Sequence, residues 1–448
     1  LAVANGFVGT EAAWLASLRG SDNINLTATL KATWQKQIGS LGVEDSRTMA
    51  VDGSGNVFVS GVYNGSISGL TLHKGLGDIF IIKYNSSGTL LWEKTLNSTD
   101  QETPLKIEYS SVDDSIVMVG YATGDLDLDP GISTLMNSGA GSFIVKLKGS
   151  DGTLSQATSW KYSTPVKFVD VDVDSAGAVY LTGVIGGSSV NIQSKTYDVN
   201  PNASVYNITA KGYMDGVIIK LSSSLDFIWA SNDGTQNTTT AFTNAVLDGN
   251  NLIRVSGMEA DTSVTSAANA KVNRNTWIKL FSTTNGTKTG THNLYGLYEA
   301  VPLSINVTKS GDTVVCGVDG VGTDLRVASQ LLLSTSTIDF SNNGFSTLFV
   351  TSLDSNGDEK WKIQSSSFGN NGCYSLDIDD NDNTIIAGEF QGTMTIGKSS
   401  INSVGGSVDS FISKLDSNGT VTSLNSFGSY QSERIQHILL DGSSVYVT

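Results

Sequence analysis

Short runs that alternate between apolar and polar residues recur along the whole chain, and this pattern is typical of half-buried β-strands rather than helices. One such run ends in a glycine at almost every occurrence. Its copies are VFVSG ending at Gly61, IVMVG at Gly120, VYLTG at Gly183, IRVSG at Gly257, VVCG at Gly317, IIAG at Gly388 and VYVT at Thr448. The closing glycines are spaced about 65 residues apart on average, so the sequence predicts a repeat protein.

Each of these runs follows another alternating run and a short turn rich in Asp, Asn and Gly, which together predict a β-hairpin. Such turns lie around Asp52, Asp174, Asp248, Asp379 and Asp441. A second hairpin alternates with the first, beginning near Asp78, Ser142, Asp215, Thr276, Ser346 and Asp409, with a degenerate copy from Ile24. Two hairpins give four antiparallel strands per repeat, and the repeat occurs seven times.

A four-stranded sheet cannot bury both of its faces alone, whereas sheets stacked around an axis can. We therefore predict an all-β fold, a seven-bladed β-propeller of four-stranded antiparallel blades, over residues 23–448. An open β-solenoid is the alternative, but its rungs are much shorter than this repeat. Residues 1–22 are predicted to form an arm or linker with a short helix in TEAAWLASLRG.

The two alternating hairpins carry a resemblance to a known family. D-x-F-I-x-K-L-D-x-N-G-x-x-x-W alternating with D-x-x-G-N-V-Y-V-T-G resembles the seven-bladed β-propeller repeat of secreted, often surface-attached bacterial proteins. DLDLDPG at Asp125 to Gly131, followed by SFIVKL, resembles a sub-type of that repeat. The resemblance spans roughly Ile24 to Thr448 and implies the fold and an extracellular setting, but it brings no catalytic motif.

The two ends of the chain suggest how a ring would close. The last repeat stops in mid-hairpin at Thr448, which would leave an unprotected strand edge, so we expect a glycine next in a longer polypeptide. We also expect residues near Ile24 to Trp34 to complete the blade begun at Asp409. The chain starts at Leu1 without a signal-peptide pattern, so either a leader was removed or this is a segment of a larger protein.

Charge and composition exclude several partners. The chain has 43 acidic and 27 basic residues, a formal net charge of −16 and a pI near 4.5. A surface of this sign repels nucleic acid and anionic membranes. No run approaches the length of a membrane-spanning helix, so we expect no membrane insertion of this segment. The two cysteines, Cys316 and Cys373, are too few for a disulfide framework and have no metal-site spacing.

Two clusters of aspartates are candidate metal ligands. Carboxylates clustered in this way can supply oxygen ligands to Ca²⁺. The same sequences also suit tight turns, and that interpretation is favoured by the repeat context. The candidate calcium ligands are Asp125, Asp127, Asp129, Asp377, Asp379 and Asp382.

Two residue types recur once per repeat. The lysines are Lys83, Lys146, Lys220, Lys279 and Lys414, and the tryptophans are Trp34, Trp92, Trp229 and Trp361. A ring of lysines could line an anion channel, but we favour lysines whose stems pack on a strand and whose ammonium groups pair with an Asp. We interpret the tryptophans as packing between blades rather than as a platform for sugars.

Catalytic and modification motifs are scarce. The three histidines, His73, His292 and His437, form no metal motif, and no nucleophile elbow or nucleotide loop occurs. Ten N-x-S/T sequons would permit glycosylation in a suitable secretory system. They lie at Asn25, Asn64, Asn85, Asn97, Asn202, Asn207, Asn237, Asn285, Asn306 and Asn418.

Long connections distinguish the middle repeats, at Gly186 to Tyr213, Ala260 to Arg274 and Val318 to Phe345. A blade needs only short turns, so we expect these loops to be unnecessary for folding and to carry binding. Tyr197, Tyr206 and Phe345 are the predicted aromatic anchors. Their partner would be a protein or glycan at the cell surface, or another copy of the chain.

Three functions remain open from the sequence. The preferred one is a non-catalytic extracellular binding or scaffolding propeller within a larger secreted, cell-surface or appendage protein. The second is a carbohydrate-active enzyme, a polysaccharide lyase or glycosidase, for which 43 acidic residues give no way to select a catalytic pair. The third is a structural subunit of an extracellular filament.

Overall fold

The computed structural model describes residues 32–38, 44–65, 77–98, 100–131, 141–161, 165–186, 195–236, 238–261, 274–297, 300–320, 346–367 and 369–448. Within these ranges every regular element is a β-strand, which confirms the all-β prediction. No helix that could cross a membrane occurs in the same ranges. The chain forms two compact units, a larger one built mainly from Ile38–Ile305 and a smaller one built from Leu1–Gln37, Asn306–Gly322 and Phe340–Val447.

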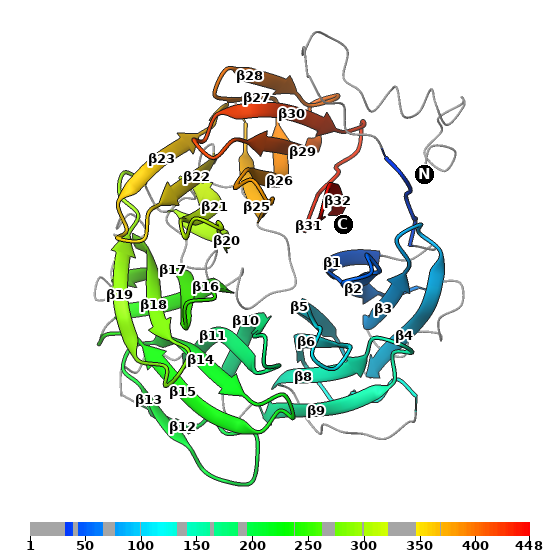
Figure 1. The fold of residues 1–448 in the computed structure, drawn as a ribbon, viewed down its shortest axis with the longest axis vertical. Coiled ribbons are helices and arrows are strands. Elements are labelled where there is room, and N and C mark those ends of the chain that lie inside the picture. Colours follow the sequence, from blue (N-terminus) through cyan, green and yellow to red (C-terminus); the bar gives the residue numbers. More distant parts are fainter. Residues whose placement is uncertain are drawn as a thin grey trace. The chain divides into compact units, whose positions relative to one another are not determined.

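The larger unit contains four antiparallel sheets that follow one another along the chain (Figure 1). Sheet I consists of β1 (Glu44–Val51), β2 (Val57–Tyr63), β3 (Asp78–Tyr84) and β4 (Leu90–Ser98), with β7 (Leu126–Asp127) on the edge of β4. Sheet II consists of β5 (Glu102–Ser110), β6 (Ser115–Ala122), β8 (Gly141–Lys148) and β9 (Leu154–Lys161). Sheet III consists of β10 (Val166–Val173), β11 (Val179–Gly186), β14 (Met214–Leu221) and β15 (Phe227–Asp233). Sheet IV consists of β16 (Thr238–Leu247), β17 (Leu252–Asp261), β18 (Arg274–Ser282) and β19 (Lys288–Asn293), and one parallel pair, Met214 with Thr239, links it to sheet III.

The smaller unit repeats the same plan, and its boundary falls within β20 (Val301–Val307). Sheet V has the order β20, β21 (Thr313–Asp319), β22 (Thr347–Leu353) and β23 (Glu359–Gln364). Sheet VI has the order β25 (Asn371–Ile378), β26 (Thr384–Gln391), β29 (Val408–Leu415) and β30 (Val421–Phe427). Smaller sheets are formed by β24 (Ser366–Ser367), β27 (Thr393–Ile396) and β28 (Ser399–Asn402), and by the hairpin of β31 (Ile438–Asp441) and β32 (Ser444–Val447).

The closing glycine of the repeat allows a close approach to the paired strand. A Cβ at Gly61 would lie 2.1 Å from the backbone oxygen of Asp45 on the paired strand and 2.7 Å from the ring of Phe80. A Cβ at Gly388 would lie 2.0 Å from the backbone oxygen of Gly372 on its paired strand. Because neither backbone can retreat without breaking the strand pair, a side chain is excluded here.

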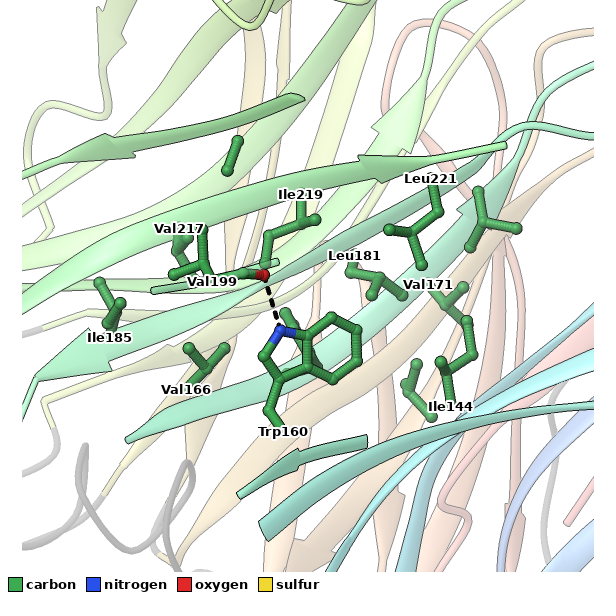
Figure 2. Close-up of a cluster of buried hydrophobic side chains, with 14 of the residues drawn as sticks. Ile144, Trp160, Val166, Val171, Leu181, Ile185, Val199, Val217, Ile219 and Leu221 are labelled. Atoms are coloured by element: carbon green, nitrogen blue, oxygen red, sulfur yellow. Dashed lines mark hydrogen bonds between the residues drawn. The ribbon is translucent and has the colours of Figure 1, made fainter. Parts of the chain in front are cut away.

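Apolar residues on facing strands form cores between successive sheets. The largest cluster in the larger unit joins sheets II and III, and includes Ile144, Leu181 and Ile219 (Figure 2). It also contains residues of β12 (Lys195–Asp198) and β13 (Asn207–Ala210), a hairpin within the long connection of the third repeat. Trp160 of β9 donates its indole N–H to the oxygen of Val199 at 2.8 Å. This connection therefore contributes to the core, and the expectation that it is unnecessary for folding is wrong.

The expected role of the first residues needs one correction. Asp409 belongs to β29, and its sheet is already complete with four strands from Asn371 to Phe427. Trp34 instead packs against Tyr446 of the hairpin β31–β32, with ring centroids 6.1 Å apart. The predicted arm and helix in residues 1–22, and residues 24–31, lie outside the described residues. Closure as a seven-bladed ring stays a prediction.

Candidate functional site

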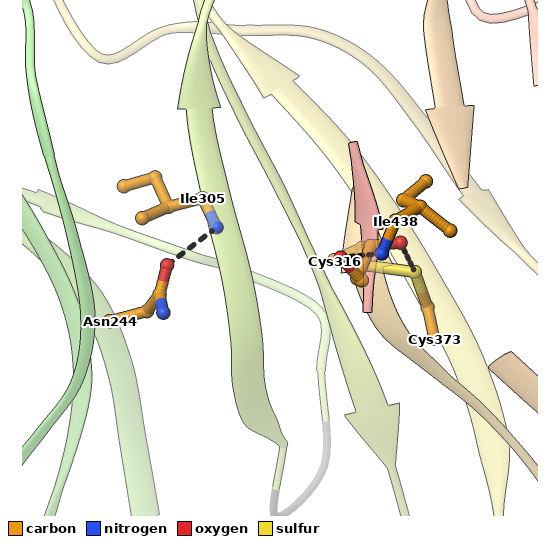
Figure 3. The surroundings of a disulfide bond; sticks show 6 residues. Asn244, Ile305, Cys316, Cys373 and Ile438 are labelled. Carbon is orange, nitrogen blue, oxygen red and sulfur yellow. Dashed lines mark hydrogen bonds between the residues drawn. A yellow bond between two sulfur atoms is a disulfide. The ribbon is translucent and has the colours of Figure 1, made fainter. Parts of the chain in front are cut away.

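The first strand of each of five sheets carries a β-bulge that redirects one side chain. The bulges follow Ser46, Pro104, Phe168, Phe242 and Cys373. In the larger unit these first strands contact one another in chain order, β1 with β5, β5 with β10 and β10 with β16. After the bulge, Thr48 accepts the Ile107 N–H at 3.1 Å, and Asn244 accepts the Ile305 N–H at 3.3 Å (Figure 3). The bulge thus points a polar side chain at the next sheet, where it accepts a backbone N–H and joins the two sheets.

Two aspartates on β10 make this connection with charged groups. Asp170 Oδ2 accepts the N–H of Ala245 at 2.7 Å, and Asp172 Oδ2 accepts the N–H of Leu247 at 2.9 Å. Asp170 is buried, with 3% of its surface exposed, whereas Asp172 is half-buried. Two neighbouring carboxylates are therefore held on one face of β10 by amides of β16.

Burial raises the pKa of both carboxyl groups. For Asp170, the ammonium of Lys106 and two backbone N–H groups oppose the rise in pKa. For Asp172, the charges of Asp170 and Glu108 add to the effect of burial and raise the pKa well above its usual range. Nearby carboxylates with shifted pKa values can transfer protons. Here, however, both already accept backbone N–H groups, so the arrangement is first of all a structural joint.

A second cluster lies in the smaller unit. The hydroxyl of Tyr374 donates to Glu389 Oε1 at 2.6 Å, and Arg434 Nε pairs with Glu389 Oε2 at 2.8 Å. Burial and the nearby Glu389 charge raise the pKa of Tyr374 well above its usual value. Burial also raises the pKa of Glu389, against the effect of its two partners.

In the larger unit, Lys167 occupies the place in the repeat that Arg434 occupies in the smaller unit. Tyr121 and Glu389 each follow the closing glycine of their repeat, Gly120 and Gly388. Lys167, from the next sheet, places its ammonium 4.8 Å from the centroid of the Tyr121 ring. Burial lowers the pKa of Lys167 to about 8. In the other described repeats the residue after the closing glycine is the apolar Val62, Val184, Met258 or Val318.

The recurring lysines are paired with carboxylates, as predicted. Their closest carboxylates are Asp52 for Lys83 (3.1 Å), Asp113 for Lys146 (2.5 Å), Asp174 for Lys220 (3.9 Å), Asp233 for Lys279 (2.8 Å) and Asp379 for Lys414 (2.8 Å). Three of these ammonium groups also donate to a backbone oxygen in the next sheet, at Gly149, Ser223 and Thr283. The lysines therefore fasten sheets together, which favours the structural interpretation over an anion channel.

The recurring tryptophans share those acceptors. Trp92 and Trp229 donate their indole N–H groups to the oxygens of Gly149 and Thr283, at 2.9 and 3.2 Å. The Trp229 ring lies against Gly286, where φ is +70° and an added Cβ would approach the ring to 2.7 Å. The predicted packing between sheets is confirmed, and it gives a second reason for glycine in the outer turn.

The aspartates predicted to bind calcium serve turns and joints. Asp127 and Asp129 accept the N–H groups of Asp129 and Gly131, and Asp125 is exposed. Asp377 accepts from Asn306 and Leu440, and Asp382 accepts the N–H of Lys309. Burial would raise the pKa of Asp379, but Lys414, Asn383 and backbone N–H groups lower it to about 2. Among the residues that the structure describes, no three acidic, His or Cys side chains are grouped to hold a metal.

The predicted aromatic anchors separate into a core residue and a surface residue. Tyr197 is 6% exposed and belongs to the core between sheets II and III, so its prediction as a surface contact is wrong. Tyr206 is 39% exposed, and its ring lies 4.7 Å from that of Phe227. Val205 and Ile228, next to Tyr206 and Phe227 in the sequence, are 69% and 47% exposed. We call Val205, Tyr206, Phe227 and Ile228 the outer patch. Phe345 lies outside the described residues.

The histidines and sequons differ in their surroundings. His292 and His437 are half-buried. The amide of Asn306 donates to Asp377 at 2.9 Å, and that of Asn97 donates to Thr95 at 3.1 Å, so both are engaged. Asn85 is half-buried, while the exposed sequons are Asn64, Asn202, Asn207, Asn285 and Asn418. His73, Asn25 and Asn237 lie outside the described residues.

A disulfide joins Cys316 of β21 to Cys373 of β25, with the two Cα atoms 5.8 Å apart (Figure 3). Both residues are fully buried. The pair was missed because its members are 57 residues apart, in different repeats and on different strands of those repeats. Lys167, Glu389 and Arg434 were missed as well. For Glu389 the signal would have been a charge directly after the closing glycine, where the other described repeats have an apolar or aromatic residue.

Comparison with known proteins gives limited similarity. No protein-family model matches the chain. An uncharacterized WD repeat-containing protein of Acanthamoeba polyphaga mimivirus is 22% identical over 218 residues. The match covers 40% of this chain and 15% of the viral protein, so the chain spans a small part of that relative.

Among solved structures, an ulvan lyase of a new polysaccharide lyase family has a TM-score of 0.44 and 9% identity, with 86% of this chain and 92% of the lyase covered. The quinohemoprotein alcohol dehydrogenase of Comamonas testosteroni also has a TM-score of 0.44 and 9% identity, covering 91% of this chain and 70% of that one. A europium-containing methanol dehydrogenase has a TM-score of 0.41 and 10% identity, covering 92% and 84%. These similarities are too weak to assign an activity.

Proposed function

We propose that this chain is a non-catalytic binding or scaffolding β-propeller of seven four-stranded blades, secreted or displayed on the cell surface within a larger protein. Six sheets with the same strand order, followed by a further hairpin, support the propeller among the described residues. The partial similarity to a protein named for its WD repeats agrees with this, because WD40 repeats build propellers.

The outer patch carries the binding role. Its side chains come from the connection of the third repeat and from the outer strand β15, and the hydroxyl of Tyr206 reaches the oxygen of Ala230 at 3.4 Å. An ordered, exposed cluster of apolar and aromatic residues is typical of an interaction surface. In contrast, the recurring lysines and the clustered aspartates are engaged in internal contacts. We therefore place the contact with a protein or glycan at the outer patch.

The disulfide supports an extracellular location. Disulfides persist in oxidising compartments and are rare in reducing ones. Cys316 and Cys373 are fully buried and join strands of two successive sheets, so the bond is part of the packing of the smaller unit.

The enzyme alternative has less support. A lyase or glycosidase needs a tyrosine or carboxylate that is free to move a proton. Tyr374 instead donates to Glu389, which also pairs with Arg434, and its raised pKa disfavours the phenolate a base would need.

The test compares binding to arrays of glycans and extracellular proteins by the parent protein and two variants. The chain should be produced without N-glycans, because the exposed sequons Asn202 and Asn207 flank the outer patch. Combining Val205→Ser, Tyr206→Ala and Ile228→Ser should weaken binding at least about tenfold, as expected for loss of an aromatic anchor. Tyr430→Ala, which removes a tyrosine that is 86% exposed and lies outside the outer patch, is the matched control.

Two outcomes would contradict the proposal. Equal binding by the parent and the triple variant would remove the outer patch as the contact. A parent protein that binds nothing on the arrays and sediments as a monomer would argue against both a scaffold and a filament subunit.

A further inference from the structure

Lys167 is an exception among the basic residues at the joints between sheets. Its side chain is half-buried, and its ammonium lies over the Tyr121 ring at 4.8 Å. Among the described residues this ammonium has no carboxylate or hydrogen-bond acceptor, although it can donate three hydrogen bonds. Charges at such joints are normally paired, so this half-buried ammonium is open to an added counter-charge.

Arg434 shows what the corresponding joint contains when it is complete. It approaches the residue after the closing glycine, as Lys167 does, and there it finds the carboxylate of Glu389 at 2.8 Å. The five recurring lysines also have a carboxylate within 4 Å. Lys167 faces the ring of Tyr121 where Arg434 faces a carboxylate.

Partial burial without a counter-charge shifts the pKa of Lys167. Burial lowers the pKa of its ammonium to about 8, and no nearby acid opposes the shift. An anion that reached this position would pair with the ammonium and raise its pKa.

We propose that Lys167 and Tyr121 form a subsite that binds the carboxylate of a small molecule, such as an acidic monosaccharide. The carboxylate would pair with the ammonium as Glu389 pairs with Arg434, while the Tyr121 ring supports the lysine from its other side. Because the Lys167 side chain is only half-buried, a small carboxylate can reach its ammonium. This site is separate from the outer patch and does not depend on its binding role.

The first test is an NMR titration of the full chain with lysine labelled at Cε. Acetate and D-glucuronate are the carboxylate probes, and D-glucose is the neutral control. We expect a saturable shift of the Lys167 resonance with both carboxylates, an increase of its pKa by about 1 unit, and no response to glucose. Lys195, an exposed lysine 5.2 Å from the Tyr197 ring, is the internal control and should not saturate.

The second test supplies the missing carboxylate within the chain. Tyr121→Glu should raise the pKa of Lys167 without any ligand and abolish the response to acetate. Tyr121→Gln introduces a side chain of the same shape as glutamate without the charge, and should not raise the pKa of Lys167. Lys167→Met identifies the resonance and should remove the response. The titration of the parent protein remains decisive if a Tyr121 variant fails to fold.

Three results would overturn the proposal. They are no saturable response of Lys167, equal responses of Lys167 and Lys195, and a response to an acidic peptide but not to acetate or glucuronate. The last would assign the site to a protein partner.

Discussion

Glu102 in the larger unit and Asn371 in the smaller unit occupy the same position of the repeat, yet their surroundings are opposite. Each lies two residues before the residue that pairs with the closing glycine, Pro104 with Gly120 and Cys373 with Gly388. Both side chains are fully buried. The comparison therefore shows which hydrogen bonds and which charge state a side chain needs at this buried position.

Asn371 is fully hydrogen-bonded. Its Oδ1 accepts the N–H of Leu348 at 2.8 Å and the hydroxyl of Ser365, and its Nδ2 donates to Ser367 and Gly369. Neither carboxyl oxygen of Glu102 has a hydrogen-bond partner among the residues that the structure describes. Burial, together with the charges of Asp78 and Asp100, raises the pKa of Glu102 to about 9. The position thus accommodates a neutral polar group that both donates and accepts, and a carboxyl group there remains protonated.

The largest expected effect follows from replacing Glu102. The pKa of this carboxyl is higher in the folded chain than in the unfolded chain, where it is about 4.3. Between these values the folded state holds a proton that the unfolded state has lost. Glu102 therefore costs about 1.4 kcal/mol of stability for each pH unit gained. Glu102→Gln should remove this slope and stabilise the protein by several kcal/mol at pH 7.

Urea unfolding at pH 5, 6, 7 and 8 measures this difference. The gain from Glu102→Gln should grow with pH over the series. Glu359→Gln, at an exposed glutamate on β23, is the control and should change little. A constant difference between parent and variant across this range would mean that Glu102 is ionised in the folded protein.

The reverse experiment removes the satisfied side chain. Asn371→Ala leaves the N–H of Leu348 and the hydroxyls of Ser365 and Ser367 without this partner, and should cost about 3 kcal/mol. Amide hydrogen exchange at Leu348 should accelerate, which separates this loss from general loosening. Unchanged exchange at Leu348 would show that another group replaces the amide. Asn371→Asp should be better tolerated at acidic than at neutral pH, because its carboxyl would resemble that of Glu102.

Much of the fold could be predicted because its signals are local. Strand alternation and the turn residues identified the hairpins, and the closing glycines marked close approaches such as Gly61 to Asp45. The pairing of Lys83 with Asp52 followed from two positions of one repeat that lie near each other in a hairpin pair. Features of this kind recur with the repeat, so several copies support each inference.

The contacts between sheets that do not recur with the repeat could not be predicted in the same way. The disulfide of Cys316 with Cys373 depends on which residues of two different repeats meet, and one chain contains a single example. Burial of Tyr197 depends on the way its hairpin folds back over the core. The candidate site residues Lys167 and Glu389 are likewise individual departures from the repeat, so a search for repeated residues passes over them.

The smallest expected effect concerns Asp172, where an acceptor is needed but a charge is not. The raised pKa means that the folded chain holds the proton more tightly than the unfolded chain. The parent therefore loses stability as the pH rises from the unfolded value of about 3.9 through the folded one. Asp172→Asn keeps an oxygen for the N–H of Leu247 and removes the repulsion from Asp170 and Glu108.

We expect Asp172→Asn to stabilise the protein by about 1 kcal/mol at pH 7, with the gain disappearing below about pH 4, where the parent carboxyl is protonated in both states. Asp377→Asn is the matched variant in the smaller unit. There both carboxylate oxygens accept, one from Asn306 and one from Leu440, so the new NH₂ group would face a donor and the variant should be less stable than the parent. Thermal unfolding of both variants at pH 4 and pH 7 decides the point, because equal changes in Tm would show that charge and hydrogen bonding act alike at the two joints.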